Sequence, residues 1–273
     1  MARDLRQSPA YAAYMRSLGW QAIKGAFIKP IPFLPFTLIK IQRPIRLPNL
    51  AVLKKFRPVY ISYEPQVGSK PPKSFKPSTP LLPSKTIRLN LTLGLTRLLA
   101  GMHPKTRYNL KKHRMPVTVF RGDKVSDKIL KQFFQIYRNN SRRQHFWGVN
   151  FSQLKSLVTC FGKNAYLFFC HEGGLLILVY DKVAYYSHNA ATLEGRKQFA
   201  PTILTWEAIK LSKKLKCHRF DFEGITDERF RLTRKWAGFT RFKQGFGGKE
   251  ISYPGAFARL GFPLASSEND TRS

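Results

Sequence analysis

The sequence predicts a mixed α/β (α+β) fold, as one large domain or as two smaller ones that divide near residue 115. The chain has 273 residues and 43% of them are apolar, so it can bury a sizeable core. Residues 1–115 combine one amphipathic helix with short strands that prolines separate. Residues 116–263 alternate long amphipathic helices with apolar strands, which is typical of a compact α/β domain. A polar tail follows over residues 264–273.

A helix is expected at the start of the first domain, in the stretch "QSPAYAAYMRSLGW". Its apolar residues recur every three or four positions, as on one face of an amphipathic helix. Ser8 can cap the N-terminus, Pro9 suits the first turn and Gly19 can end the helix.

Short strands and a proline-rich loop are expected in the rest of the first domain. The strands lie over residues 26–60, where prolines interrupt the apolar runs. Residues 64–85 contain six prolines, so we expect an exposed basic loop without regular structure. The alternating stretch "TIRLNLTL" predicts a strand after this loop.

Two helices with a break between them are expected where the domains join, in "GLTRLLAGMHPKTRYNLKKHR". Arg107, Lys111 and Arg114 are spaced so that they share one face of the second helix. Together with Lys105, they form a candidate binding surface for a polyanion. The alternative is a solvated helix face with no partner.

The second domain is expected to follow the order β-α-α-β-β-β-α-β and to close with a hairpin. The elements before the hairpin are expected at 116–120, 126–144, 150–162, 165–191 (three strands), 200–217 and 219–225. "TRFKQGF" and "EISYPGAF" are the expected hairpin strands, and Gly247 and Gly248 serve the turn because they lack Cβ. This order of elements is that of an N-acetyltransferase-like (GNAT) domain.

The charge of the chain indicates a polyanionic partner. There are 48 Lys and Arg residues against 15 Asp and Glu residues, a formal charge of +33. Residues 1–115 hold 22 of the basic residues and only two acids, Asp4 and Glu64. RNA, DNA, anionic lipid or a phosphorylated substrate would each be attracted by this surface. Alternatively, the charge could reflect a generally basic proteome.

Several classes of protein lack support in the sequence. No P-loop, H-E-x-x-H or C-x-x-C pattern is present, so we expect no metal and no cofactor. The three cysteines are widely spaced, and "MARDLRQSPA" has no apolar core of a signal peptide, so we expect a cytoplasmic protein. The apolar stretch "AFIKPIPFLPFTLIKI" is too short and too interrupted to span a bilayer, although it could dock on a membrane surface.

The segment before the helix at 200–217 does not favour coenzyme A as the acyl donor. A GNAT domain that uses acyl-CoA normally holds the pyrophosphate with a glycine-rich loop at this place. Here the sequence is "LEGRKQFAPTIL", in which Gly195 stands alone and Phe199 and Pro201 occupy the expected loop. Such a loop presents few bare amides to a pyrophosphate.

Four separated segments resemble the FemABX aminoacyltransferases, in the same order along nearly the whole chain. They are "LRQSPAYAAYMRSLGW", "MHPKTRYNLKKHRMPV", "APTILTWEAIKLSKKLKCHRFDFEGI" and "GFTRFKQGFGGKEISYPG". The resemblance implies two tandem GNAT-like domains. It also implies transfer of an amino acid from aminoacyl-tRNA to the stem peptide of a UDP-linked or lipid-linked peptidoglycan precursor, without coenzyme A.

The resemblance also implies roles for single residues. Phe242 and Lys243 match a Phe-Lys pair that lines the family's catalytic channel, where an ammonium can stabilise the oxyanion of acyl transfer. Arg143 matches an arginine that holds the precursor's phosphates, and Lys24 lies near a lysine with the same task. His188 stands where relatives often carry a channel tyrosine.

Some of these residues could instead have no part in the reaction. Lys243 could be a surface lysine, and the local alignment around Lys24 can shift by two residues. Asp221 and Glu223 could supply a general base or could be structural. Lys105, Arg107, Lys111 and Arg114 become candidate tRNA contacts if the resemblance holds.

The chain departs from the fuller family in its short first domain and in the absence of an inserted coiled-coil arm. We therefore expect a monomeric, cytoplasmic aminoacyltransferase. The inner face of an anionic membrane is a further expected partner. Two alternatives remain open at this point. One is a GNAT-like N-acyltransferase that uses acyl-CoA or another acyl carrier, and the other is a basic RNA- or membrane-binding protein without enzymatic activity.

Overall fold

The computed structural model describes residues 2–23, 25–144, 146 and 148–261. These residues form two compact units. The large unit contains residues 85–251 together with the start of the chain up to Leu5, and the small unit contains residues 6–84 together with the described residues after Ile251.

These units differ from the domain boundary expected at residue 115. The strand over residues 85–90 joins the sheet of the large unit, so the two helices that follow it also belong there. The last strand, over residues 256–260, returns to the sheet of the small unit. Strand pairing rather than position in the chain therefore decides the membership of both segments.

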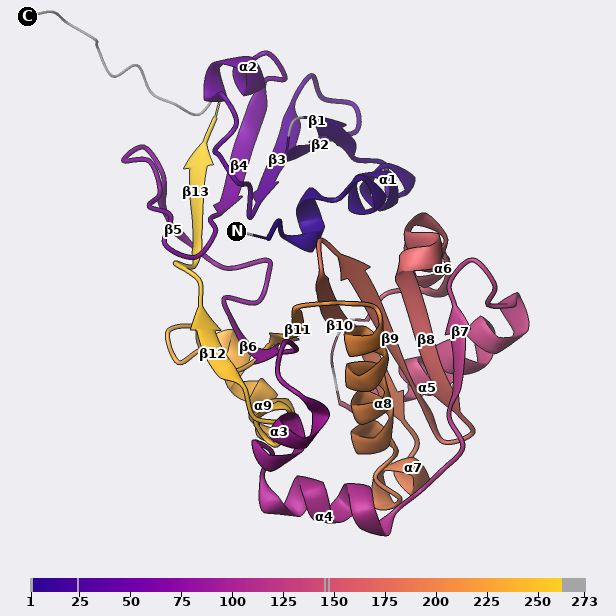
Figure 1. Ribbon diagram of the computed structural model, residues 1–273. Helices are drawn as coiled ribbons and strands as arrows, with labels where there is room; N and C mark the ends of the chain where they lie inside the picture. The colour runs from indigo at the N-terminus through magenta and orange to yellow at the C-terminus, as the bar shows by residue number, and fades with distance from the viewer. Residues whose placement is uncertain (1, 24, 145, 147, 262–273) are drawn as a thin grey trace, which may run out of the picture. The chain divides into compact units, whose positions relative to one another are not determined.

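The large unit is built on a seven-stranded sheet with the order β12-β6-β11-β10-β9-β8-β7 (Figure 1). Its strands are β6 (Lys85–Asn90), β7 (Thr118–Arg121), β8 (Ala165–Cys170), β9 (Gly173–Tyr180), β10 (Val183–Ala191), β11 (Arg219–Gly224) and β12 (Lys249–Ser252). From β6 across the sheet to β7, the neighbouring strands β10 and β11 run parallel, and the other neighbouring pairs are antiparallel.

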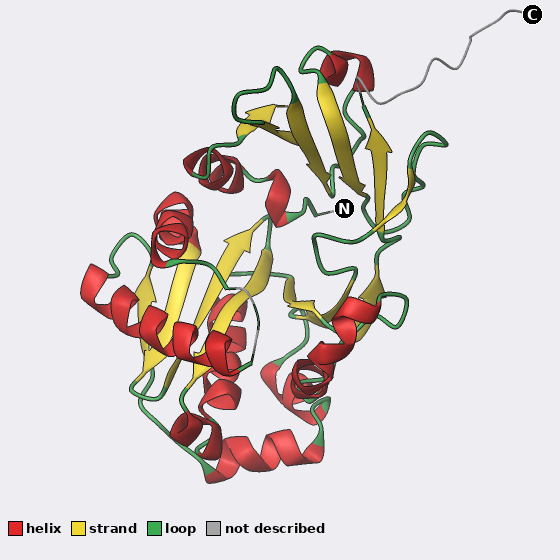
Figure 2. Cartoon of the chain, turned by 180° about the vertical axis from the view of Figure 1, so that it is seen from behind, coloured by secondary structure: helices red, strands yellow, loops and turns green. Residues whose placement is uncertain are grey.

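Helices cover both faces of this sheet (Figures 1 and 2). The helices are α3 (Leu95–Ala100), α4 (Pro104–Lys112), α5 (Asp127–Arg143), α6 (Phe151–Phe161), α7 (Leu193–Lys197), α8 (Ala200–Lys214) and α9 (Ala237–Gln244), with 3-10 turns η2 (Gly162–Asn164) and η3 (Arg231–Trp236). Leu204 of α8 packs in one core with Leu175 of β9. On the opposite face, Gly174 leaves room for Phe133 of α5, since a Cβ there would lie 2.4 Å from the phenyl ring.

Strands β10 and β11 are paired only at their beginnings. The register joins 183–185 with 219–221, and β10 has an irregularity between Tyr186 and His188. On β11 the pairing with β6 is also interrupted, between Asp221 and Gly224, where Glu223 has a left-handed φ of 57°. Each strand therefore carries backbone groups beyond the paired part that need other partners.

The small unit contains a six-stranded sheet with the order β1-β2-β3-β4-β13-β5 (Figure 1). Its elements are η1 (Leu5–Gln7), α1 (Pro9–Ser17), β1 (Gln21–Ile23), β2 (Ala26–Pro30), β3 (Thr37–Gln42), α2 (Leu50–Lys54), β4 (Pro58–Glu64), β5 (Lys76–Ser78) and β13 (Ala256–Leu260). β3 and β4 are parallel, with Thr37 opposite Pro58, and α2 connects them. Ile28, Ile39 and Ile61 lie at the centre of the core of this unit.

Most helices predicted from the sequence are confirmed with their caps. The side chain of Ser8 accepts a hydrogen bond from the amide of Tyr11, and that of Ser126 from the amide of Ile129. Asn150 and Gln153 form a capping box at the start of α6. The break between α3 and α4 is also present, with Pro104 as the first residue of α4.

The predicted closing hairpin is wrong in both strands, since "EISYPGAF" divides between β12 and β13, which lie in different sheets. Residues 237–244 form helix α9, not a strand, and β12 begins only at Lys249. Phe242 and Phe246 are four residues apart and their rings lie 5.4 Å apart, which is the contact expected on one side of a helical turn. The helical turn thus brings both aromatic rings to the core of the large unit, with Phe246 buried just after the helix and Phe242 partly buried within it.

The proline-rich segment is mostly irregular, as expected, but it is tied down. β5 lies within it, and Phe75 is buried at 4% exposure. The carboxylate of Glu64 accepts hydrogen bonds from the amides of Leu81 and Leu82 at 2.9 and 2.6 Å. In the described part of the chain, no helix combines the length and the apolar character needed to cross a membrane.

Candidate active site

Lys243 lies in the last turn of α9 and reaches the place where β10 and β11 separate. Its Nζ donates a hydrogen bond to the carbonyl oxygen of Gly224, at 2.6 Å, just where β11 ends. The same nitrogen lies 5.4 Å from the ring centroid of Tyr186 on β10, in cation–π geometry. The side chain is only 8% exposed, so the ammonium is enclosed by both strands.

The burial of Lys243 changes its acidity. Desolvation lowers the pKa of the ammonium to about 8, against the opposing charges of Glu223 and Asp221. The group is therefore mostly protonated at pH 7 and can lose its charge just above that pH. Among the described residues, its one hydrogen-bond acceptor is the carbonyl of Gly224, so the ammonium has further N–H groups for a ligand.

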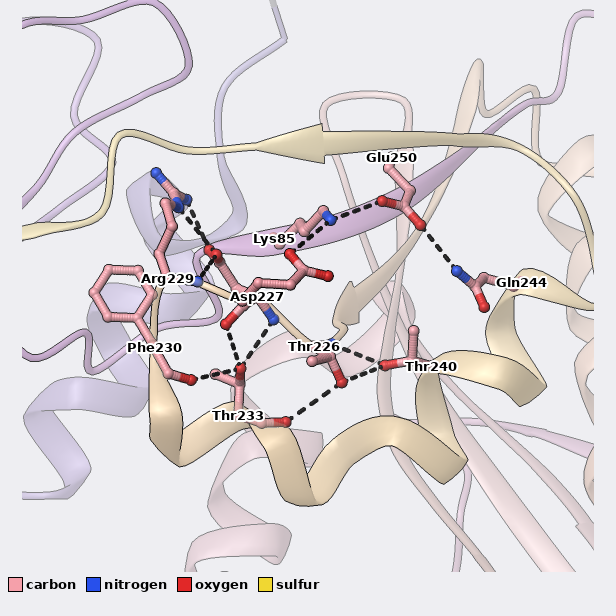
Figure 3. A network of polar contacts seen from close by, with 10 residues as sticks. Lys85, Thr226, Asp227, Arg229, Phe230, Thr233, Thr240, Gln244 and Glu250 are labelled. Carbon is pink, nitrogen blue, oxygen red and sulfur yellow. Dashed lines mark hydrogen bonds and ion pairs between the residues drawn. The ribbon is translucent and has the colours of Figure 1, made fainter.

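A network of hydroxyl and carboxylate contacts holds α9 in place (Figure 3). Thr240 of α9 accepts a hydrogen bond from the amide of Thr226 at 2.8 Å, and their hydroxyls lie 3.0 Å apart. At the end of the helix, Gln244 donates to Glu250 at 3.0 Å, and Glu250 pairs with Lys85 of β6 at 2.9 Å. These contacts join the middle of α9 to the segment after β11 and the end of α9 to β12 and β6.

The segment between β11 and α9 has a turn with its own hydrogen bonds (Figure 3). The hydroxyl of Thr233 accepts from the amide of Asp227 at 2.9 Å and lies within hydrogen-bond distance of two carbonyl oxygens, those of Asp227 and Phe230. Arg229 pairs with the carboxylate of Asp227 at 2.7 Å. The position of Lys243 is therefore fixed before any substrate binds.

Asp221 and Glu223 have different environments although both lie on β11. The buried carboxylate of Asp221 accepts hydrogen bonds from Thr86 at 2.6 Å, Arg88 at 2.7 Å and the amide of Glu223 at 2.9 Å. These partners make Asp221 a structural residue. Glu223 does not continue the alternation of β11, because its φ of 57° turns the backbone. The two carboxylates therefore do not share one face of β11, as residues two positions apart on a regular strand would.

Aromatic side chains line β10 next to Lys243. The Tyr186 hydroxyl is hydrogen-bonded to Thr205 of α8, and burial raises the pKa of this phenol. Phe242 is partly buried and packs on the core through Phe246, so it supports α9 rather than standing free. His188 is partly buried 5.4 Å from the ring of Tyr137, and burial lowers its pKa to about 4, which makes it a neutral residue near pH 7.

Arg143 and a second arginine, Arg196, converge on one amide oxygen. Arg143 donates to Oδ1 of Asn140 at 2.8 Å and to the carbonyl of Ala191 at 3.3 Å. Arg196 of α7 donates to the same Oδ1 at 2.6 Å, and burial together with the charge of Arg143 lowers its pKa. Within the described residues neither arginine has a salt bridge to a carboxylate, so the pair can receive an anion.

The expected polyanion residues do not form one helical stripe. Arg114 lies beyond the end of α4, since His113 is already extended. Arg107 donates to the carbonyls of Ala100 and Met102, which ends α3. Lys105 and Lys111 are exposed on α4, so they remain available to a polyanion.

Lys24 lies outside the described residues. Its neighbours Ile23 and Gly25 line a cavity of about 200 Å³ in the small unit. Arg6 and Arg16 also line this cavity, and the sequence alone did not point to either of them. No group of three or more potential metal-ligating side chains occurs among the residues that the structure describes.

The segment expected to lack a pyrophosphate loop is a short helix. Gly195 is buried within α7, and a Cβ there would lie 2.4 Å from the carbonyl oxygen of Glu172. This glycine therefore serves packing. Phe199 has a left-handed φ of 57° at the start of α8, and its ring lies 4.7 Å from the ring of His113.

The sequence did not identify three of these partners of the site. The carbonyl of Gly224, the ring of Tyr186 and the guanidinium of Arg196 each meet a predicted residue only after folding. The sequence contains one signal for Tyr186, because this residue lies two positions before the candidate His188 in the same predicted strand.

Comparison with known proteins gives a family for the part of the chain that holds Lys243. Residues 172–264 match the model of the FemAB family. Over this segment the chain is similar to the FemAB family. The segment includes His188, Arg196 and Lys243, and it confirms over these residues the resemblance predicted from the sequence. A search of curated protein sequences gave no significant match.

Solved structures support the same fold over nearly the whole chain. The crystal structure of FemX has a TM-score of 0.76 at 16% identity and covers 95% of this chain and 92% of its own. The C-terminal domain of a candidate lysylphosphatidylglycerol synthetase from Agrobacterium fabrum has a TM-score of 0.62 at 12% identity, covering 93% and 88%. A tandem GNAT protein of clavulanic acid biosynthesis has a TM-score of 0.52 at 9% identity, covering 88% and 79%. The FemAB segment thus belongs to a chain with a FemX-like fold, and the expected GNAT-like architecture is confirmed.

Proposed function

We propose that this protein is an aminoacyltransferase that moves an amino acid from aminoacyl-tRNA to the stem peptide of a peptidoglycan precursor. The observation that carries the proposal is the buried ammonium of Lys243, held between β10 and β11 within the FemAB segment. The FemX-like fold supports the class of reaction, and the charge of +33 supports a nucleic-acid donor.

The proposed reaction needs one positioned cation. The amine of the precursor attacks the carbonyl carbon of the ester that joins the amino acid to the ribose. The tetrahedral intermediate carries an oxyanion, which the Lys243 ammonium stabilises by a charge-assisted hydrogen bond. The carbon–oxygen bond to the ribose then breaks, an amide forms, and the ribose oxygen takes the proton lost by the amine. No covalent enzyme intermediate is required, and Phe242 keeps α9 packed.

We assign the recognition of the two substrates to separate groups. Arg143, with Arg196 beside it, binds the phosphates of the precursor, since two guanidiniums without a carboxylate partner suit that charge. Lys24 and the cavity lined by Arg6 and Arg16 provide a further candidate site for the same precursor. Lys105 and Lys111, with Arg114 beyond the end of α4, contact the tRNA, and Arg107 supports them by ending α3. His188 lines the channel as a neutral residue.

The test offers the purified protein a pool of labelled aminoacyl-tRNAs with a UDP-linked muropeptide precursor. Label in the precursor supports the proposal and identifies the amino acid. A parallel arm offers phosphatidylglycerol vesicles as the acceptor, because one structural neighbour is a candidate lysylphosphatidylglycerol synthetase. Label in the lipid instead would keep the donor but contradict the acceptor.

The two alternatives predict other outcomes. An acyl-CoA-dependent N-acyltransferase would bind coenzyme A in calorimetry and transfer its acyl group. A basic RNA- or membrane-binding protein would bind RNA with strong salt dependence, would keep that binding after Lys243→Ala, and would transfer nothing.

Replacing the carboxylate of Glu223 should change the pH dependence of transfer. The ammonium form of Lys243 is the active one, so activity falls as the pH rises through its pKa of about 8. Glu223→Gln removes a charge that raises this pKa, so the falling limb should move by about one pH unit toward acid. Glu207→Gln, on α8, is the control and should leave the limb unchanged. If the pH dependence of kcat is the same for Glu223→Gln and Glu207→Gln, the proposed role of Lys243 is contradicted.

Removing Arg143 should weaken the binding of the precursor. Arg143→Ala is expected to raise the KM for the precursor by about tenfold or more with little change in kcat, because a charged hydrogen bond to phosphate is lost. Arg142→Ala, at the neighbouring exposed position of α5, is the matched control. Equal changes in both variants, or a change confined to kcat, would show that Arg143 does not bind the precursor.

A further inference from the structure

The turn between β2 and β3 exposes large apolar side chains at its tip. Phe33 is fully exposed at 106%, and Leu34 is exposed at 55%. Single exposed apolar residues are common on proteins, but two adjacent ones at the tip of a turn are not explained by packing. Neither side chain takes part in the core of the small unit.

The turn is a defined structure that presents these side chains. The amide of Ile31 donates to the carbonyl of Phe36 at 2.9 Å, and the amide of Leu34 donates to the carbonyl of Ile31 at 3.2 Å. Phe33 has a left-handed φ of 62°, a conformation that is unfavourable for a bulky side chain. Strain of this kind persists where the exposed position of the side chain is itself useful.

Basic residues lie at the same end of strands β3 and β4 as the turn. β3 and β4 start side by side, with Thr37 opposite Pro58, so the turn before β3 and the segment before β4 share one end. The guanidinium of Arg57 lies 5.6 Å from the ring of Phe36, and its carbonyl accepts the amide of Thr37 at 3.2 Å. Lys54 and Lys55 are exposed immediately before it.

No acidic side chain among the described residues of the small unit offsets this charge at the surface. Residues 6–84 contain 13 lysines and arginines and one acid, Glu64. That acid is buried at 4% exposure and is engaged with the amides of Leu81 and Leu82. An apolar tip surrounded by cations without anions is the pattern of proteins that bind the surface of an anionic bilayer.

We propose that the turn over residues 31–36 inserts into the headgroup region of an anionic membrane. Phe33 and Leu34 enter the boundary between headgroups and acyl chains, and Lys54, Lys55 and Arg57 contact the lipid phosphates. RNA would use the same cations, and its bases stack on aromatic rings such as Phe33 but not on the aliphatic Leu34 beside it, which favours lipid as the occupant. The docking is independent of the transfer reaction proposed above, and it would keep the protein at the surface on which lipid-linked substrates lie.

The test measures binding of the whole chain to vesicles by co-sedimentation. We expect binding to vesicles that contain phosphatidylglycerol, weaker binding to pure phosphatidylcholine, and loss of binding at high salt. The double variant Phe33→Ser with Leu34→Ser should weaken the partition by about tenfold or more. The double variant Lys54→Gln with Lys55→Gln should weaken it by about tenfold or more as well.

Matched controls separate this surface from the general charge of the chain. Leu81→Ser removes another exposed leucine of the small unit, and Lys128→Gln with Lys131→Gln removes two exposed charges from α5. Both controls should change the partition by less than about threefold, since neither lies at the turn. Vesicle binding that the Phe33 and Leu34 substitutions leave unchanged would overturn the proposal. A dimer of the wild-type chain that dissociates in the Phe33→Ser, Leu34→Ser variant would also overturn it, because the turn would then contact a second copy. Transfer activity in detergent tests the proposed reaction separately and should be the same in all of these variants.

Discussion

Lys243→Met is expected to reduce the rate of amino-acid transfer by about 10² to 10³-fold in kcat, with little change in the KM of either substrate. Removal of one donor that stabilises an oxyanion typically has an effect of this size. Methionine fills a similar volume without the charge, and the side chain is only 8% exposed, so the fold should be kept. The variant is compared with wild type by steady-state transfer of a labelled amino acid.

The control for this prediction is Lys235→Met, which removes an exposed lysine from η3 eight residues earlier. It should leave kcat within about twofold. The temperature of thermal unfolding of both variants must equal or exceed that of wild type, since a buried ammonium without a salt bridge is itself destabilising. If Lys243→Met transfers at the wild-type rate, the only task of Lys243 is to hold the carbonyl of Gly224.

Asp221→Ala is expected to produce the largest loss of stability among single substitutions near the site. The carboxylate is 1% exposed, and it joins Thr86 and Arg88 of β6 to β11. Loss of one partner leaves the charge of Arg88, which is 24% exposed, without its carboxylate. We expect a decrease of about 3 kcal/mol in the free energy of unfolding, measured by denaturant titration.

The matched control is Asp123→Ala, which breaks the exposed pair with Arg121. It should leave the unfolding midpoint unchanged, because solvent screens such pairs. If Asp221→Ala and Asp123→Ala unfold at the same denaturant concentration, the buried carboxylate does not link the two strands. Asp221→Ala should also lower the pKa of Lys243 further, because the negative charge of the Asp221 carboxylate raises that pKa in the wild-type protein.

Local signals in the sequence predicted most of the helices. Ser8, Ser126 and Asn150 each precede an apolar repeat of helical period, and each caps a helix in the structure. The three strands expected over residues 165–191 are present, and Asp181 and Lys182 form the turn between the last two, with left-handed φ values of 47° and 61°.

The segment around Lys243 was harder to predict because its aromatic residues fit two periods. Phe239 and Phe242 are three positions apart, as on a helix, while the glycines that follow suggested a hairpin. The helix is decided by tertiary contacts, namely the Thr226–Thr240 pair and the burial of Phe246, which no local pattern reveals. Lys243 itself was identified by resemblance to a family, not by periodicity.

The partners of the site residues depend on register and on long-range packing. Gly224 and Lys243 are 19 residues apart, and Asn140 and Arg196 are 56 residues apart. The sequence shows each residue type but not the meeting of the two. The same limit applies to Arg107, whose guanidinium ends α3 instead of facing a polyanion.

A single-turnover reaction tests the central claim most directly. Wild-type protein in excess is mixed with each labelled aminoacyl-tRNA of the pool in turn and with the muropeptide precursor. We predict that label appears in the precursor as a base-stable amide while an equal amount of tRNA becomes deacylated, and that Lys243→Met slows both by about 10² to 10³-fold. Label that remains on tRNA with every amino acid, together with transfer of an acyl group from coenzyme A to any acceptor, would contradict the claim.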